Sequence, residues 1–114
     1  MENISHKDKI AVMRILKDII YADGIVDKRE LAMYSDIMDQ LGLDEVAEHE
    51  IDKLNTLVAL SYLTRMPDAE KREFATMMGR MIAVDGDINY NEVKLYNLVM
   101  DFCDIPGEDY PAEG

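Results

Sequence analysis

The sequence lacks the features that mark a secreted or membrane-spanning protein. It contains one cysteine, Cys103, so no disulfide forms within the chain, and this scarcity is typical of a reducing compartment. The N-terminus reaches a charged pattern at once, without the apolar core of a signal peptide. No run of about 18 apolar residues occurs, which argues against a membrane-spanning helix. We therefore expect a cytoplasmic protein without membrane insertion.

Basic residues are also scarce. The chain has 12 lysines and arginines against 24 aspartates and glutamates, which gives a formal net charge of −12 and a pI near 4.4. Such a charge repels the phosphate groups of nucleic acids and of anionic lipids, which argues against both as partners. It leaves divalent cations, a basic protein partner, or solubility alone as explanations of the charge.

The sequence offers no recognisable catalytic motif. Its two histidines, His6 and His49, lack the spacing of zinc ligands on a helix, so both are expected on the solvated surface. There is no glycine-rich phosphate loop, no nucleophile elbow and no Cys-x-x-Cys pair. Cys103 falls on an apolar face and is expected to be a buried, inert thiol. We expect that the protein is not an enzyme.

An internal repeat organises the chain. The residues from Asp23 to Glu30 return as those from Asp85 to Glu92, at an offset of 85 minus 23, or 62 residues. Apolar residues on either side of both copies recur at helical spacing and map onto one another at the same offset. Each copy is therefore predicted to be the turn of a helix–turn–helix unit. The two units cover about residues 5–41 and 67–103.

A central segment, residues 44–66, separates the two units. Gly42 is placed to stop the helix before it, and Asp44 is placed to cap the next helix. The segment then contains an apolar helix, which we expect to be the most buried element of the fold, with Leu54, Leu57, Val58 and Leu60. No stretch alternates with period two for long enough to predict a strand. The sequence therefore predicts an all-α fold of five to seven helices with internal pseudo-twofold symmetry, formed by one domain over residues 1–105 and followed by an irregular tail, residues 106–114.

Most positions of the repeated motif are explained by turn chemistry. Gly24 and Gly86 follow an apolar helix, where a left-handed residue ends the helix and glycine adopts that conformation most easily. Asp27 and Asn89 are good N-cap residues for the helix that follows. Glutamates three residues later complete a capping box, and apolar residues on either side fit a hydrophobic staple. On this interpretation the turns are purely structural, but the aspartate before each glycine is left unexplained.

The same turns also gather oxygen ligands. Carboxylate and amide oxygens are the donors that Ca²⁺, Mg²⁺ or Mn²⁺ prefer. The motif matches the second half of an EF-hand loop, but the first half has no carboxylates, so a working EF-hand is rejected. What is left is a hypothesis of an incomplete cation site, with candidate ligands Asp23, Asp27, Glu30, Asp85, Asp87, Asn89 and Glu92.

The repeated pattern apolar-Ala-Asp-Gly-x-Val-Asp-x-x-Glu, which begins at Ile20 in the first copy, resembles the signature of the TerB-like (tellurite-resistance) family. The resemblance covers about residues 5–105 and implies a compact helical fold with an acidic, cation-binding patch. Members of the family are associated with tellurite resistance and stress response, and a related domain begins a membrane-anchored J-domain co-chaperone. This chain has no transmembrane segment and no J domain, and Asn89 stands where the family has an acid.

Two functional hypotheses follow. The first is a non-enzymatic TerB-like module that binds a divalent cation weakly at its repeated turns, in a tellurite-resistance or stress-response context. The alternative is a protein–protein interaction or scaffold domain, whose turns are purely structural and whose acidic surface binds a basic partner.

Overall fold

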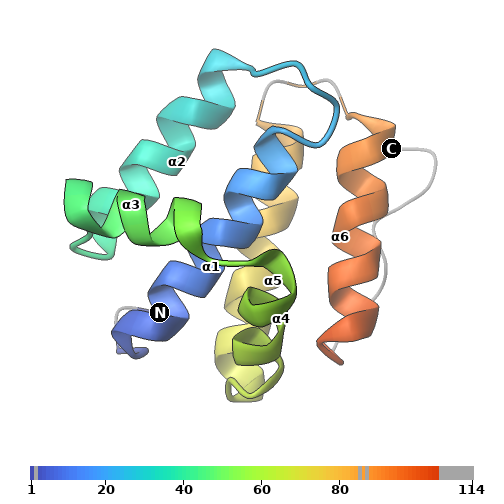
Figure 1. Cartoon of the computed structure of the whole chain (residues 1–114). Coiled ribbons are helices and arrows are strands. Elements are labelled where there is room, and N and C mark those ends of the chain that lie inside the picture. Colours follow the sequence, from blue (N-terminus) through green and yellow to red (C-terminus); the bar gives the residue numbers. More distant parts are fainter. Residues whose placement is uncertain (2, 85, 87, 106–114) are drawn as a thin grey trace.

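The structure is a computed structural model that describes residues 1, 3–84, 86 and 88–105. Over these residues the fold consists of six α-helices and no strand, as the sequence predicts (Figure 1). None of the helices in this part of the chain is long and apolar enough to cross a membrane. The helices in chain order are α1 (His6–Ile20), α2 (Lys28–Gln40), α3 (Glu45–Lys53), α4 (Thr56–Thr64), α5 (Asp68–Ala83) and α6 (Tyr90–Phe102).

The helix boundaries repeat at the offset found in the sequence. Adding 62 to the bounds of α1 gives residues 68–82, and α5 covers residues 68–83. Adding 62 to the bounds of α2 gives residues 90–102, which are the bounds of α6. The chain therefore contains two helical hairpins of equal length, α1–α2 and α5–α6, with α3 and α4 between them.

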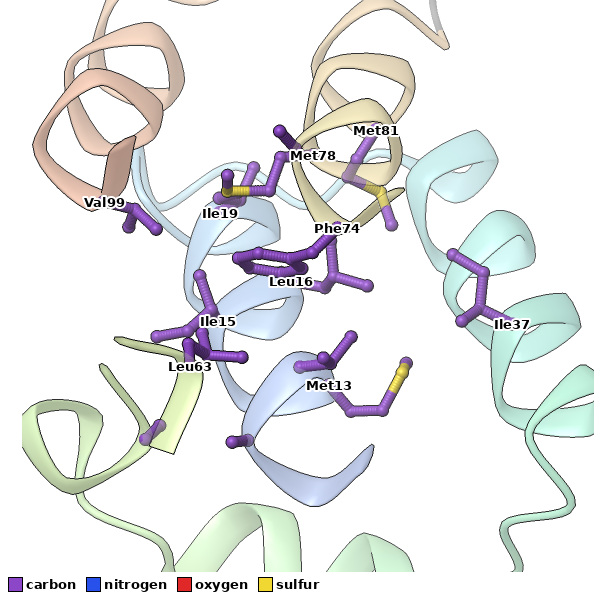
Figure 2. Packing of buried hydrophobic residues seen from close by; sticks show 14 of the residues in the cluster. Met13, Ile15, Leu16, Ile19, Ile37, Leu63, Phe74, Met78, Met81 and Val99 are labelled. Carbon is purple, nitrogen blue, oxygen red and sulfur yellow. The ribbon is translucent and has the colours of Figure 1, made fainter. Parts of the chain in front are cut away.

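Helix α1 forms the centre of the hydrophobic core. It contacts each of the other five helices, and eight of its 15 residues are buried. Side chains from α4, α5 and α6 gather around it, among them Leu63, Phe74 and Val99 (Figure 2). The run from Ile10 to Met13 has four consecutive buried side chains, so this part of α1 is covered over most of its circumference. Further along the helix, Arg14, Lys17 and Asp18 are half-exposed.

The expectation for the central segment is wrong in two respects. Leu54 lies outside both helices, because Asn55 takes an extended conformation and its side-chain oxygen caps α4 by accepting the backbone N–H groups of Leu57 and Val58. Leu57 and Val58 are themselves 66% and 40% exposed. Helix α4 has nine residues and buries one face, so α1 and not the central segment is the most buried element.

Both hairpins end in the same turn. After α2, Gly42 has a φ of +70° and the N–H of Leu43 donates to the carbonyl of Met38 at 2.9 Å. After α6, Asp104 has a φ of +52° and the N–H of Ile105 donates to the carbonyl of Met100 at 3.0 Å. This is the Schellman arrangement, in which a left-handed residue lets the chain satisfy the last carbonyls of a helix. The second copy uses aspartate where the first uses glycine.

Exchanging these two residue types should move stability in opposite directions. We expect Gly42→Ala to lower the free energy of unfolding by about 1 kcal/mol, because a left-handed conformation is strained for alanine. The added Cβ meets no atom within 4 Å, so the cost comes from the backbone alone. We expect Asp104→Gly to raise the free energy of unfolding by up to about 1 kcal/mol for the same reason. Urea denaturation measures both, and a loss of stability in Asp104→Gly would show that the aspartate side chain is needed in the turn.

Candidate functional site

The first repeated turn begins where α1 ends. Gly24 has a φ of +78°, the predicted left-handed conformation, but α1 already ends at Ile20 with Tyr21 as its C-cap, so Gly24 lies in the turn after the helix. The carboxylate of Asp23 accepts the backbone N–H of Ile25 through Oδ1 at 2.9 Å, which closes a tight side-chain turn. Asp23 therefore has a structural role that the motif alone did not reveal.

Asp27 caps α2, as predicted. Its Oδ1 accepts the backbone N–H of Arg29 at 2.7 Å, and the Arg29 guanidinium lies 3.5 Å from the same oxygen. The hydrogen bond from the Arg29 backbone, together with the nearby guanidinium, holds the pKa of the Asp27 carboxyl below its usual range. Asp27 is thus a charged cap at the positive end of the helix dipole.

The second repeated turn is capped in the same way by an amide. Gly86 has a φ of +77°, and Asn89 caps α6 by accepting the backbone N–H groups of Asn91 and Glu92 at 2.8 and 3.2 Å. Because Oδ1 of Asn89 faces these donors, its Nδ2 points away from the helix. The predicted ligands Asp85 and Asp87 lie outside the described residues.

The two turns meet through one side-chain hydrogen bond. Nδ2 of Asn89 donates to Oδ2 of Asp23 at 2.8 Å, across 66 residues of sequence. Both oxygens of Asp23 therefore accept N–H groups of the chain itself, one from its own turn and one from the other turn. We call Asp23, Asp27 and Asn89 the turn pair. The structure brings these three predicted site residues to one end of the fold, where the loops after α1 and α5 lie (Figure 1).

The two glutamates of the motif are buried. Glu30 and Glu92 are 1% and 3% exposed, although a capping-box residue on the first turn of a helix is ordinarily solvated. A buried carboxylate is costly unless it is hydrogen-bonded, and both residues make interactions within the fold. The sequence does carry a signal for this burial, because Glu30 falls on the stripe that continues through Tyr34 and Ile37.

The candidate ligands among the described residues do not complete a cation site. Calcium takes six to eight oxygen ligands, and Mg²⁺ requires six in near-octahedral geometry. The oxygens of Asp23 and Asn89 already accept backbone or amide hydrogens, and the Asn89 nitrogen that faces Asp23 is not a ligand for a hard cation. Within residues 1, 3–84, 86 and 88–105, no three histidine, cysteine, aspartate or glutamate side chains form a group that could hold a metal ion.

A second polar cluster fixes α3 against α1 and α2. Nζ of Lys17 lies 2.6 Å from Oε1 of Glu48 and also binds Asp52, while the Tyr34 hydroxyl donates to Oε2 of Glu48 at 2.9 Å. Burial lowers the pKa of Lys17, but the hydrogen bonds to Asp52 and Glu48 outweigh it, so the pKa is raised overall. Burial, reinforced by Glu48, raises the pKa of Tyr34 far above its usual range. This cluster is therefore a charged lysine held between two carboxylates.

The remaining predicted side chains behave as ordinary structural residues. Cys103 is fully buried, its thiol donates to the carbonyl of Leu60 at 3.6 Å, and burial raises its pKa, which confirms the prediction of a buried thiol. His6 lies on the surface and contacts the carboxylate of Glu50 at 3.0 Å.

The acidic residues are unevenly distributed. Between Arg29 and Lys53 the sequence has eight acids and no lysine or arginine. Apart from the buried Glu30, these acids lie on the second half of α2, the loop after it and α3, and all seven have exposed or half-exposed side chains. We call them the acidic face, which consists of Asp36, Asp39, Asp44, Glu45, Glu48, Glu50 and Asp52. The absence of basic residues over this stretch is the signal that the motif-based interpretation overlooked.

Comparison with known proteins shows a shared fold. The chain matches the crystal structure of a protein of unknown function from Porphyromonas gingivalis W83 with a TM-score of 0.77 and 25% sequence identity, over 93% of this chain and 89% of that chain. No family model matches the chain, and no curated protein matches its sequence. The likeness extends over nearly the whole of both chains, so the arrangement of six helices is not peculiar to this sequence.

The contact between the turns can be tested with one isosteric change. Aspartate caps helices as well as asparagine, so Asn89→Asp keeps the cap of α6 but sets a second carboxylate against Asp23. We expect the free energy of unfolding in urea to fall by about 1–3 kcal/mol at neutral pH, because a hydrogen bond is replaced by a repulsion. The repulsion raises the carboxyl pKa in the folded state, so the deficit should shrink as the pH falls and one carboxyl becomes protonated.

A matched control is the reverse change at the equivalent position of the first turn. Asp27→Asn also keeps a cap and alters the charge by one unit. Among the described residues, the side chain of Asp27 interacts with Arg29 of its own turn, so a smaller effect is expected. If Asn89→Asp is as stable as the wild type both at neutral pH and at lower pH, the Asn89–Asp23 contact does not hold the turns together.

Proposed function

We propose that this protein is a non-enzymatic interaction module of the TerB-like kind, which binds a basic segment of a partner protein on its acidic face. The observation that carries the proposal is the concentration of seven accessible carboxylates on α2, α3 and the loop between them, without a lysine or arginine in the same stretch. Fields of one sign steer oppositely charged partners and repel phosphate-bearing ones. A cytoplasmic stress-response setting belongs to the same proposal.

The turn pair supports this function indirectly. Asp23, the residue that turn chemistry left unexplained, is used to join the two hairpins through Asn89. The repeated motif is then part of the scaffold, and the charge that is free to act lies elsewhere. On the acidic face, Asp36, Asp39 and Glu45 are exposed, and no described lysine or arginine forms an ion pair with them.

The proposal predicts binding that depends on where the charge lies and not on how much there is. A fluorescent oligolysine peptide should bind the wild type, and its affinity should fall steeply with added salt. Neutralising three acids of the face, as Asp36→Asn, Asp39→Asn and Glu45→Gln together, should weaken binding by about tenfold, since each rim charge contributes up to about 1 kcal/mol. Fluorescence anisotropy at two salt concentrations measures the effect.

The control removes the same charge from the opposite hairpin. A triple variant with Asp68→Asn, Glu70→Gln and Asp101→Asn has the same net charge and leaves the acidic face intact. It should bind the peptide nearly as well as the wild type. Equal losses in both triple variants would reduce the binding to an effect of net charge and would refute the proposed face.

A second candidate function, weak binding of Ca²⁺, Mg²⁺ or Mn²⁺ at the turn pair, is favoured by one observation. Two of the candidate ligands, one from each turn, lie in contact, with Nδ2 of Asn89 2.8 Å from Oδ2 of Asp23. A cation shared by two turns would join the hairpins in the same sense as this hydrogen bond does.

This candidate predicts stabilisation by metal. A ligand at 100 times its Kd stabilises the folded state by about 2.7 kcal/mol, so the melting temperature should rise with the concentration of the ion. Asp23→Asn should abolish the rise while the fold persists, because the amide still accepts the N–H of Ile25. Calorimetric titration of the wild type provides the direct measurement. The absence of both heat and a thermal shift with all three ions would eliminate this candidate.

A further inference from the structure

Within the acidic face there is a groove with an apolar floor. It lies between the second half of α2 and the start of α3, with a volume of about 300 Å³. Its floor is formed by Tyr34 and Met38, one helical turn apart on α2, and by Leu43 in the loop. Its rim is formed by Asp39, Asp44 and Glu45.

The floor is held in place by the fold before any ligand arrives. The Tyr34 hydroxyl is fixed by Glu48, which is itself bound by Lys17. Leu43 is fixed beside Met38 by the hydrogen bond from its N–H to the Met38 carbonyl, and an apolar contact between these two positions is typical of this turn. A preformed groove lowers the entropic cost of binding.

The rim carries charges that the fold does not neutralise. Asp44 uses one oxygen to cap α3 through the N–H of Ala47, and among the described residues Asp39, Asp44 and Glu45 form no ion pair with a lysine or arginine. Helix α2 has no basic residue in its own last turn, and among the described residues the one lysine at its C-terminal end, Lys9 of α1, donates to the carbonyl of the C-cap residue Leu41 at 3.0 Å and forms no ion pair with the rim. The electrostatics of the groove therefore favour a cationic ligand.

We infer that this groove is the anchoring point for a basic peptide segment of a partner protein, in which an apolar side chain occupies the floor and flanking lysines or arginines pair with the rim. The inference rests on the proposed function and narrows it from a face to a site. Charge complementarity supports this occupant, since the rim is acidic and the net charge of the chain is −12. The protein already shows how this surface holds a lysine, because Lys17 lies between Glu48 and Asp52.

The test compares two peptides of equal charge. Both are fluorescent oligolysines, one with a central leucine and the other with a central serine. The leucine peptide should bind the wild type about tenfold more tightly, because burying one leucine in an apolar site accounts for at least that factor. In ¹³C-methyl spectra of methionine-labelled protein, the Met38 signal should shift with the leucine peptide.

Two arginine variants separate the groove from the rest of the surface. Ser35 lines the groove and is exposed on α2, so Ser35→Arg fills the groove and adds one positive charge at a position where arginine is a good helix former. Thr76→Arg also replaces an exposed hydroxyl residue with arginine, at a position on α5 away from the groove. The preference for leucine over serine should disappear in Ser35→Arg and persist in Thr76→Arg.

The possible failures are distinguishable. If both peptides bind the wild type equally and Ser35→Arg behaves like Thr76→Arg, the groove is not the anchor, although the acidic face still binds basic segments. The same conclusion follows if Met38 does not respond while signals elsewhere do. If neither peptide binds the wild type, the proposed function fails together with the groove.

Discussion

The whole fold depends on the burial of α1. Its apolar side chains are buried because all five other helices pack against it. Burial of one such side chain contributes about 1.5–3 kcal/mol, and α1 alone buries eight residues. Helix α4 owes its place to this constraint, since it buries Ala59, Leu60 and Leu63 and leaves its first turn in solvent. The two hairpins are held together because α1 of the first hairpin packs against α5 and α6 of the second, and α2 packs against α5.

The polar interactions then determine how the hairpins meet. A hydrophobic core tolerates small rotations of one hairpin against the other, whereas a hydrogen bond between Asn89 and Asp23 at 2.8 Å does not. At the other side of α1, Lys17 fixes α3 through Glu48 and Asp52. Asparagine is suited to the first contact because it presents an oxygen to the helix and a nitrogen to the carboxylate at the same time.

Local chemistry was predictable from the sequence, and long-range chemistry was not. The four helices of the two hairpins, the left-handed conformation of the glycines and the caps at Asp27, Asp44 and Asn89 follow from periodicity and from residues close in sequence. The contact of Asn89 with Asp23 joins residues 66 positions apart, and no local rule pairs them. The prediction that the central segment is the most buried element was wrong because it equated high apolar content with burial. The core is instead organised around α1, which contacts all five other helices.

The repeat also indicates where function should be sought. Positions 34, 38 and 43 are Tyr, Met and Leu, and their equivalents at 96, 100 and 105 are Tyr, Met and Ile, so the buried frame is conserved between the two copies. The exposed positions differ, because Asp36 of α2 corresponds to Leu98 of α6, and Gln40 corresponds to Phe102. Packing constrains buried positions and leaves exposed ones free to diverge. Asp39 is matched by Asp101, but exposed Asp36 is matched by leucine, so the charge of Asp36 is not demanded by the fold and is available to an external binding partner.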